Sequence, residues 1–181
     1  MSGTQVELSG TAVLVLCGGL AWLVGSAALD QGVGTVILAA GLALTVWLFT
    51  VVRREPLAPY PLPGPRRRRV LGLLVGAVLL TGVGGTLLSS QGFGEFTIPA
   101  TAIVFGAVLV PISSTVDRRA LGLVALALIG IGVAGAMLAA RSIGPTYPEG
   151  LVGFGVGVVL WLTGAAYGGV LTGLRDRVGS R

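Results

Sequence analysis

Side chains able to do acid–base, nucleophilic or metal chemistry are few in this 181-residue chain, and they lie at the ends of long apolar runs. The chain has no histidine and no lysine, and its single cysteine, Cys17, lies inside the first apolar run. Zinc sites built from histidine and cysteine, bis-histidine haem and hydrolysis by a serine with a histidine or lysine base are therefore excluded. No phosphate-binding loop and no pair of carboxylates occurs within an apolar run. We expect no catalytic residues, no cofactor and a protein that is not an enzyme.

Three carboxylates, Asp30, Glu95 and Glu149, stand singly in short polar segments between apolar runs. If the fold brought them together, they could form a weak cation site to which loop carbonyls would add ligands. The alternative interpretation is three separate solvated charges, one of them paired with Arg141.

The longest polar segment, residues 53–69, reads RREPLAPYPLPGPRRRR and holds five of the nine prolines. Its prolines favour an extended polyproline II conformation over residues 55–65, so this segment is predicted to be a stiff linker. Its last four residues directly precede an apolar run and are Arg66, Arg67, Arg68 and Arg69. Such a cluster sets membrane topology and attracts anionic lipid headgroups by about 1 kcal/mol per charge. We expect no nucleic-acid partner despite a pI near 10.7, because positive charge kept on the cytoplasmic side explains the basic balance.

The elements that must position these residues are six apolar runs, at about 11–29, 33–52, 70–88, 98–116, 120–140 and 151–174. Apolar residues make up 54% of the chain and charged residues 10%, against about 25% charged residues in a soluble domain. Each run reaches the roughly 20 residues that cross a bilayer as a helix. The sequence therefore predicts an all-α membrane protein, residues 1–181 forming one integral domain in the cell membrane. Arginine without lysine is typical of a GC-rich prokaryotic genome.

Arginine placement predicts the orientation. With both termini cytoplasmic, eleven of the twelve arginines lie on the inner side and only Arg141 lies outside. The excess of cytoplasmic arginine found in membrane proteins favours this N-in, C-in arrangement.

The chain also repeats itself. Residues 68–88 align without gaps to residues 118–138, and Gly72, Ala77, Gly82, Val83 and Gly85 are among the identical positions. Further along, Pro99, Phe105 and Gly106 match Pro148, Phe154 and Gly155, and the nine-residue spacing of Gly25 and Gly34 recurs at Gly85 and Gly94 and at Gly135 and Gly144. The alternative is chance similarity of glycine-rich runs. We predict three tandem hairpins related as parallel repeats with near-threefold character. Their bounds are about 11–52, 70–116 and 120–174, with a cytoplasmic linker at 53–69 and a cytoplasmic tail at 175–181.

The 31 glycines of the chain favour close helix packing, since small residues let helix backbones approach in lipid. The candidate packing residues are Gly72, Gly76, Gly153, Gly155, Gly157, Gly164 and Gly168. The alternative to helix packing is that these glycines line a pore. Pro111 is predicted to kink its run by removing the hydrogen bond to residue 107, and Ser113, Ser114 and Thr115 are expected to bond the freed carbonyls.

Two functions remain open. Packing glycines without buried charge favour a non-enzymatic accessory or scaffold bundle, with the bilayer, anionic lipid headgroups and either a membrane-protein partner or a second copy as its contacts. The alternative is a passive channel or facilitator for a small neutral solute, favoured by the repeats, Pro111 and the glycine-rich last run.

Overall fold

A computed structural model describes residues 10–27, 29, 31–54, 64–116, 119–141 and 148–167. The described residues form helices and one tight turn, and none of them lies in a strand. The elements in chain order are α1 (Gly10–Ala27), α2 (Gln31–Arg54), α3 (Gly64–Ser90), the short 3-10 helix η1 (Gly94–Phe96), α4 (Thr97–Val116), α5 (Arg119–Arg141) and α6 (Pro148–Tyr167).

All six predicted apolar runs are helical wherever the structure describes them, except at Leu29, which lies in a bend after α1. Five of the helices, α2 to α6, are long and apolar enough to cross a membrane, and α1 adds a shorter apolar stretch, Ala12–Ala27. This confirms the all-helical class and is compatible with a multi-pass membrane protein. The predicted last run is described as helix only to Tyr167, and residues 168–174 lie outside the described residues.

Helix α3 begins at Gly64, six residues before the predicted start of its apolar run. The four arginines at 66–69 therefore belong to a helix and not to the linker. Pro65 explains the early start, because proline is favoured in a first helical turn, where its missing N–H would have no partner. Arginine is itself a good helix former. The linker residues 55–63, for which an extended conformation was predicted, lie outside the described residues.

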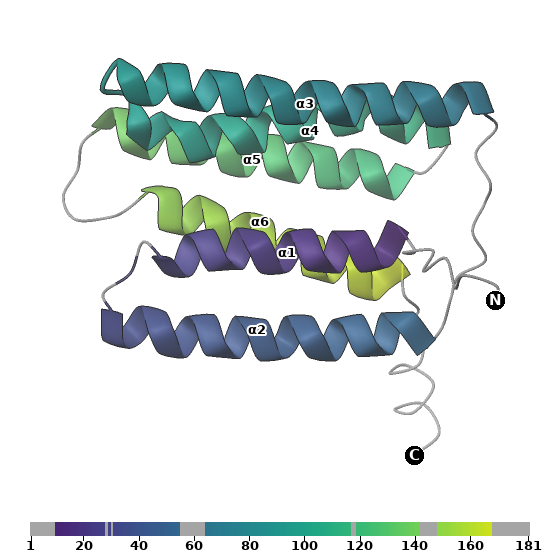
Figure 1. Ribbon diagram of the computed structural model, residues 1–181, viewed down its shortest axis with the longest axis horizontal. Helices are drawn as coiled ribbons and strands as arrows, with labels where there is room; N and C mark the ends of the chain where they lie inside the picture. The colour runs from purple at the N-terminus through teal and green to yellow at the C-terminus, as the bar shows by residue number, and fades with distance from the viewer. Residues whose placement is uncertain are drawn as a thin grey trace, which may run out of the picture.

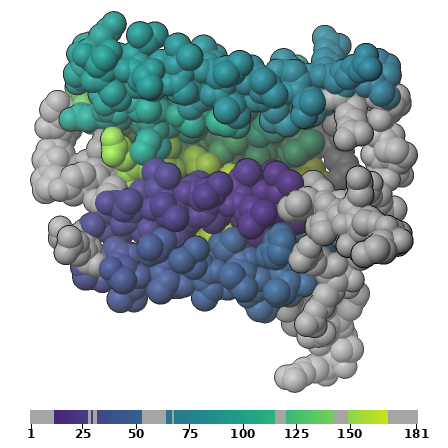
Figure 2. All heavy atoms as spheres, in the orientation of Figure 1, coloured from purple at the N-terminus to yellow at the C-terminus, as the bar shows by residue number. Residues whose placement is uncertain are grey.

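The helices lie side by side in the spatial order α3, α4, α5, α6, α1, α2 (Figure 1). The most extensive contacts join α4 to α5 and α6 to α1, helices whose pairing crosses from one predicted hairpin to the next. Helices α2 and α3 follow each other in the chain but occupy opposite edges of this array (Figures 1 and 2). The array is therefore open between α2 and α3, where a closed ring of three hairpins would have a contact.

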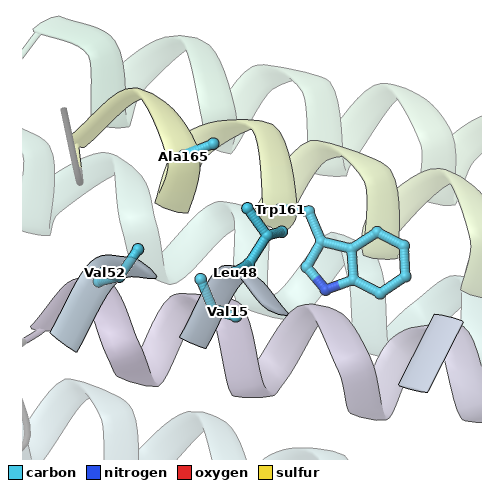
Figure 3. Close-up of a cluster of buried hydrophobic side chains, with 5 residues drawn as sticks. All are labelled: Val15, Leu48, Val52, Trp161 and Ala165. Carbon is cyan, nitrogen blue, oxygen red and sulfur yellow. The ribbon is translucent and has the colours of Figure 1, made fainter. Parts of the chain in front are cut away.

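The buried core lies toward the α1–α2–α6 side. Its larger cluster joins these three helices and consists of Val15, Leu48, Val52, Trp161 and Ala165 (Figure 3). A second cluster, Val124, Leu128 and Leu160, joins α5 to α6. Among the described side chains of α3, only Ala77 is buried.

A tight turn reverses the chain between α3 and α4. Gly92 has a φ of 82°, which lies in the left-handed region that glycine adopts without steric cost. The amide of Phe93 donates to the carbonyl of Leu88 at 2.8 Å, and the amide of Gly92 donates to that of Ser89 at 3.2 Å. These bonds satisfy carbonyls at the end of α3 and bring α4 back alongside it.

Candidate helix-packing site

The predicted packing glycines of α6 face two different neighbours. A Cβ on Gly153 would lie 2.6 Å from the backbone nitrogen of Gly25 on α1, so the two backbones are in direct contact. Gly155 faces α5, where a Cβ would lie 3.2 Å from the Ile131 side chain. Gly164 is buried, and Gly168 lies outside the described residues.

Helices α4 and α5 meet through two glycines in a reciprocal arrangement. A Cβ on Gly132 would lie 2.8 Å from the carbonyl oxygen of Pro99 and 3.0 Å from the nitrogen of Ile103. A Cβ on Gly106 would lie 2.8 Å from the carbonyl oxygen of Ala125 and 3.0 Å from the nitrogen of Ile129. Each glycine thus sits against residues three and seven positions before the other glycine, an arrangement we call a reciprocal glycine pair.

Helices α6 and α1 meet through a second reciprocal glycine pair, Gly157 and Gly25. A Cβ on Gly25 would lie 2.9 Å from the nitrogen of Phe154 and 3.1 Å from the carbonyl oxygen of Gly150. For Gly157 the corresponding atoms are the carbonyl oxygen of Gly18 at 3.1 Å and the nitrogen of Trp22 at 3.3 Å. The same spacing of three and seven residues recurs on both helices, so the chain makes one type of antiparallel contact twice.

Glycine is required at these positions because the neighbouring atoms are backbone atoms, which cannot move aside as a flexible side chain can. The close approach brings Cα–H groups toward carbonyl oxygens, a weak attraction common at helix–helix interfaces. Gly157 was predicted as a packing residue, whereas Gly25, Gly106 and Gly132 were not. The aligned identities Gly82/Gly132 and Gly106/Gly155 contained the signal that could have found two of them.

The glycines of α3 behave differently. Nothing lies within 4 Å of a Cβ built on Gly72, Gly76, Gly82 or Gly84, whereas Gly85 contacts Thr97 of α4. Gly72 and Gly76, which were expected to pack against a helix, therefore pack against no residue that the structure describes. The physical reason is that α4 covers only one side of α3, and these two glycines lie on another side.

Aromatic rings fill the space that the glycines leave between α1, α2 and α6. The Trp22 indole packs over Gly41 of α2, and its Nε1 donates to the carbonyl oxygen of Ile37 at 2.9 Å. Trp22 also lies against Phe154 and Trp161, with ring centroids 4.7 and 4.8 Å away. Both tryptophans therefore pack between helices.

Trp161 is 4% exposed and lies among the side chains of the larger core cluster (Figure 3). Its indole lies against Gly18, where a Cβ would come within 2.6 Å of the ring. The Trp161 Nε1 has no hydrogen-bond acceptor in the described part of the chain. The ring is therefore held by shape and dispersion, without a hydrogen bond from its Nε1.

Pro111 lies within α4 and is exposed. The hydroxyl of Ser113 donates to the carbonyl of Val110 at 2.7 Å, and that of Ser114 donates to the carbonyl of Pro111 at 2.9 Å. The expectation that these serines bond the carbonyl freed at residue 107 is wrong. Each hydroxyl reaches the carbonyl three residues before it, which is the nearest one on its own turn. The side chain of Thr115 lies outside the described side chains.

The three carboxylates between the apolar runs do not form a described cluster. Glu95 is exposed in η1, Glu149 is half-buried in the first turn of α6, and Asp30 lies outside the described residues. Within the described ranges, no group of three or more histidine, cysteine, aspartate or glutamate side chains could hold a metal ion.

A shallow, open depression of about 460 Å³ lies where α3 begins and α4 ends, lined by Pro65, Arg66, Arg69 and Ser114. Two guanidinium groups and a hydroxyl suit a phosphate group, because arginine offers several N–H donors in a planar fork. Arg68 is also exposed, and the side chain of Arg67 is not described.

Comparisons with known protein families, with curated protein sequences and with solved structures give no match. The functional argument therefore depends on three features of the described residues. Two reciprocal glycine pairs join neighbouring helices, and aromatic rings fill one side of the bundle. Helix α3 has glycines on an exposed face that no described residue covers.

Proposed function

We propose that this protein is a non-enzymatic, integral membrane bundle that acts through helix packing as an accessory or scaffold subunit. The observation that supports this function best is the contrast between filled and unfilled packing surfaces. Helices α1, α4, α5 and α6 use glycines for direct backbone contact, whereas the apolar part of α3 has four glycines that no described residue covers. In lipid, such small-residue faces are where another helix approaches closely.

The proposed setting is the cell membrane, with three tandem hairpins and both termini in the cytoplasm. The distribution of arginine supports this orientation. In it, the depression at Pro65, Arg66, Arg69 and Ser114 lies at the cytoplasmic end of α3, at the level of lipid headgroups. We propose that it binds the phosphate of an anionic lipid, which would also anchor that end of the helix.

A passive channel for a small neutral solute is the second candidate, and one specific feature favours it. Pro111 is exposed in α4 and removes a backbone hydrogen bond there, as in many helices that move. The packing of α6 argues the other way, because Gly153, Gly155 and Gly157 lie against atoms of α1 and α5. Glycines in such contacts are not free to line a passage.

The test is mass spectrometry of the intact complex, extracted in native nanodiscs. The accessory function predicts a distinct membrane protein in fixed ratio with this chain, and Gly76→Leu on the open face of α3 should remove it while Gly130→Leu should not. Gly130 is the matched control because a Cβ there also meets nothing within 4 Å. If the chain runs alone or only with itself, the accessory function is wrong. Solute flux into reconstituted vesicles then tests the channel.

A further inference from the structure

The reciprocal glycine pair recurs in the order of the helices, although the repeat aligns Gly106 with Gly155 and not with Gly157. Each pair joins an even-numbered helix to an odd-numbered helix of another hairpin: α4 to α5, and α6 to α1. A third contact of this kind would join α2 to α3. In one chain it is missing, because α2 and α3 lie at opposite edges of the array (Figure 1).

Helix α3 carries the face that this missing contact requires. The α5 side of the α4–α5 pair uses Ala125, Ile129 and Gly132. The ungapped alignment of 68–88 with 118–138 places Val75, Leu79 and Gly82 at those positions. Ala125 is 0% exposed, whereas Val75 and Leu79 are 51% and 62% exposed, and nothing lies near a Cβ on Gly82.

Helix α2 carries the matching face on the opposite edge. The α4 side of the pair uses Pro99, Ile103 and Gly106. At the 60-residue offset that aligns Gly34 with Gly94, the corresponding residues of α2 are Ala39, Ala43 and Val46, and all three are exposed. Helix α2 uses a different side, with Gly41, Thr45 and Leu48, to pack against its neighbours. The two faces are therefore free at the same time.

We propose that two copies of this chain associate head to tail, the face Ala39, Ala43 and Val46 of α2 on one copy packing against the face Val75, Leu79 and Gly82 of α3 on the next. The direction of the helices favours a contact of α2 with α3 over a contact between two α3 helices, because both reciprocal glycine pairs join antiparallel helices. Copies that share one membrane orientation place α2 antiparallel to α3 of a neighbour, whereas two α3 helices would be parallel. Val46 replaces one glycine of the pair, so the contact between copies is less close than those within the chain.

This inference deepens the proposed function and rests on it in one respect, since both treat the open side of α3 as a packing surface. Different experimental results would contradict the accessory function and the contact between copies. A homo-oligomer without another membrane protein would end the accessory function and leave this contact standing. A complex with another protein but without contact between copies would do the reverse.

The experiment is oxidative cross-linking between two differently tagged copies in native membranes, in a Cys17→Ala background. One copy carries Val46→Cys and the other Leu79→Cys, the counterparts of Gly106 and Ile129. We expect a disulfide-linked product that carries both tags. The control pair is Leu44→Cys with Leu80→Cys, which are also exposed and lie at a similar depth but on other sides of α2 and α3.

A glycine substitution then tests the packing itself. Gly82→Leu, added to the copy with Leu79→Cys, should lower the yield of cross-linked product about tenfold, which corresponds to about 1.4 kcal/mol. Gly130→Leu should leave the yield unchanged, because it fills equally open space on a different helix face. Size-exclusion profiles of the uncross-linked proteins establish that both variants fold.

Three results would overturn the proposal. One is no product at the 46–79 pair, which would mean that lipid alone covers these faces. Another is an equal or larger yield at the 44–80 control pair or between two copies with Leu79→Cys. The third is a product that joins this chain to another protein, which would assign the face to a different partner.

Discussion

Helices α3 and α5 share an aligned Arg-x-Leu-Gly-Leu pattern near their amino-terminal ends and glycines at three aligned positions, yet α3 is the most exposed of the membrane-length helices and α5 is well packed. Leu128 of α5 is 3% exposed, and the aligned Val78 of α3 is 59% exposed. Gly132 touches the backbone of α4, and the aligned Gly82 touches no residue in the described part of the chain. Similar helices therefore differ in burial because of their neighbours.

The cause lies in the order of the helices in space. Helix α5 has α4 on one side and α6 on the other, whereas α3 has only α4, because α2 is at the far edge. A small-residue face thus marks where a helix can be approached closely, and the rest of the fold determines whether the approach occurs within the chain. The predictions below test this conclusion, beginning with the largest effect.

Gly132→Leu should destabilise the folded protein strongly, whereas Gly82→Leu should not. A leucine at 132 would force its Cβ to within 2.8 Å of the Pro99 carbonyl oxygen, and such overpacking costs about 1–3 kcal/mol or more. Fluorescence-detected size-exclusion chromatography after stepwise heating measures the difference. Equal losses of stability in the two variants would end the comparison of α3 with α5.

Exchanging the aligned residues at 125 and 75 tests the same contrast with smaller changes in volume. Ala125→Val adds two methyl groups at a position that is 0% exposed and should cost about 1–2 kcal/mol. Val75→Ala removes the same volume from an exposed position, and its effect should stay within about 0.5 kcal/mol. Thermal unfolding in one detergent compares both with the parent protein. A destabilising Val75→Ala would mean that this face of α3 is covered, either within its own chain or by a second copy.

The amino-terminal end of α3 should hold anionic lipid through its two depression-lining arginines. The double substitution Arg66→Gln and Arg69→Gln removes two charges worth about 1 kcal/mol each at a lipid surface. Native mass spectrometry from phosphatidylglycerol nanodiscs should show fewer retained lipids. Arg141→Gln, at the opposite end of the bundle, serves as the control. Equal losses in the control and the double variant would exclude a specific site at the depression.

The two tryptophans extend the comparison to α1 and α6, and they predict the smallest effect. Trp22→Phe removes the hydrogen bond from Nε1 to Ile37 and should cost about 0.6 kcal/mol more than Trp161→Phe, since the Trp161 Nε1 has no acceptor in the described residues. Thermal unfolding midpoints of the two variants, measured in the same detergent, give this difference in stability. A more damaging Trp161→Phe would show that ring volume matters more than the hydrogen bond.

Several features of the fold could be predicted from residues that lie close together in the chain. Runs of about 20 apolar residues between arginines and short polar segments predicted six helices, and every described helix except α3 begins within a few residues of its predicted start. The early start of α3 at Gly64 was missed, although Pro65 is a recognisable first-turn residue. The expected partner of the Pro111 serines was also wrong, because hydroxyl groups bond locally, within one helical turn.

The packing site was predictable only in part. Small-residue spacing along α6 led to Gly153, Gly155 and Gly157, which the structure places against α1 and α5. The same kind of spacing led to Gly72 and Gly76, which touch no described residue. Spacing within one helix carries no information about the partner, so Gly25, Gly106 and Gly132, each opposite a backbone of another helix, were not found.

By itself the sequence determined the composition of each helix, where each apolar run ends and which side chains are available for chemistry, because these properties depend on residues close together in the chain. Only the tertiary structure decided which helices meet. Residues 25 and 157, or 106 and 132, come together through the path of the whole chain, and the pairing of α1 with α6 joins helices near its two ends. That path buries the small-residue face of α5 and leaves the matching face of α3 open.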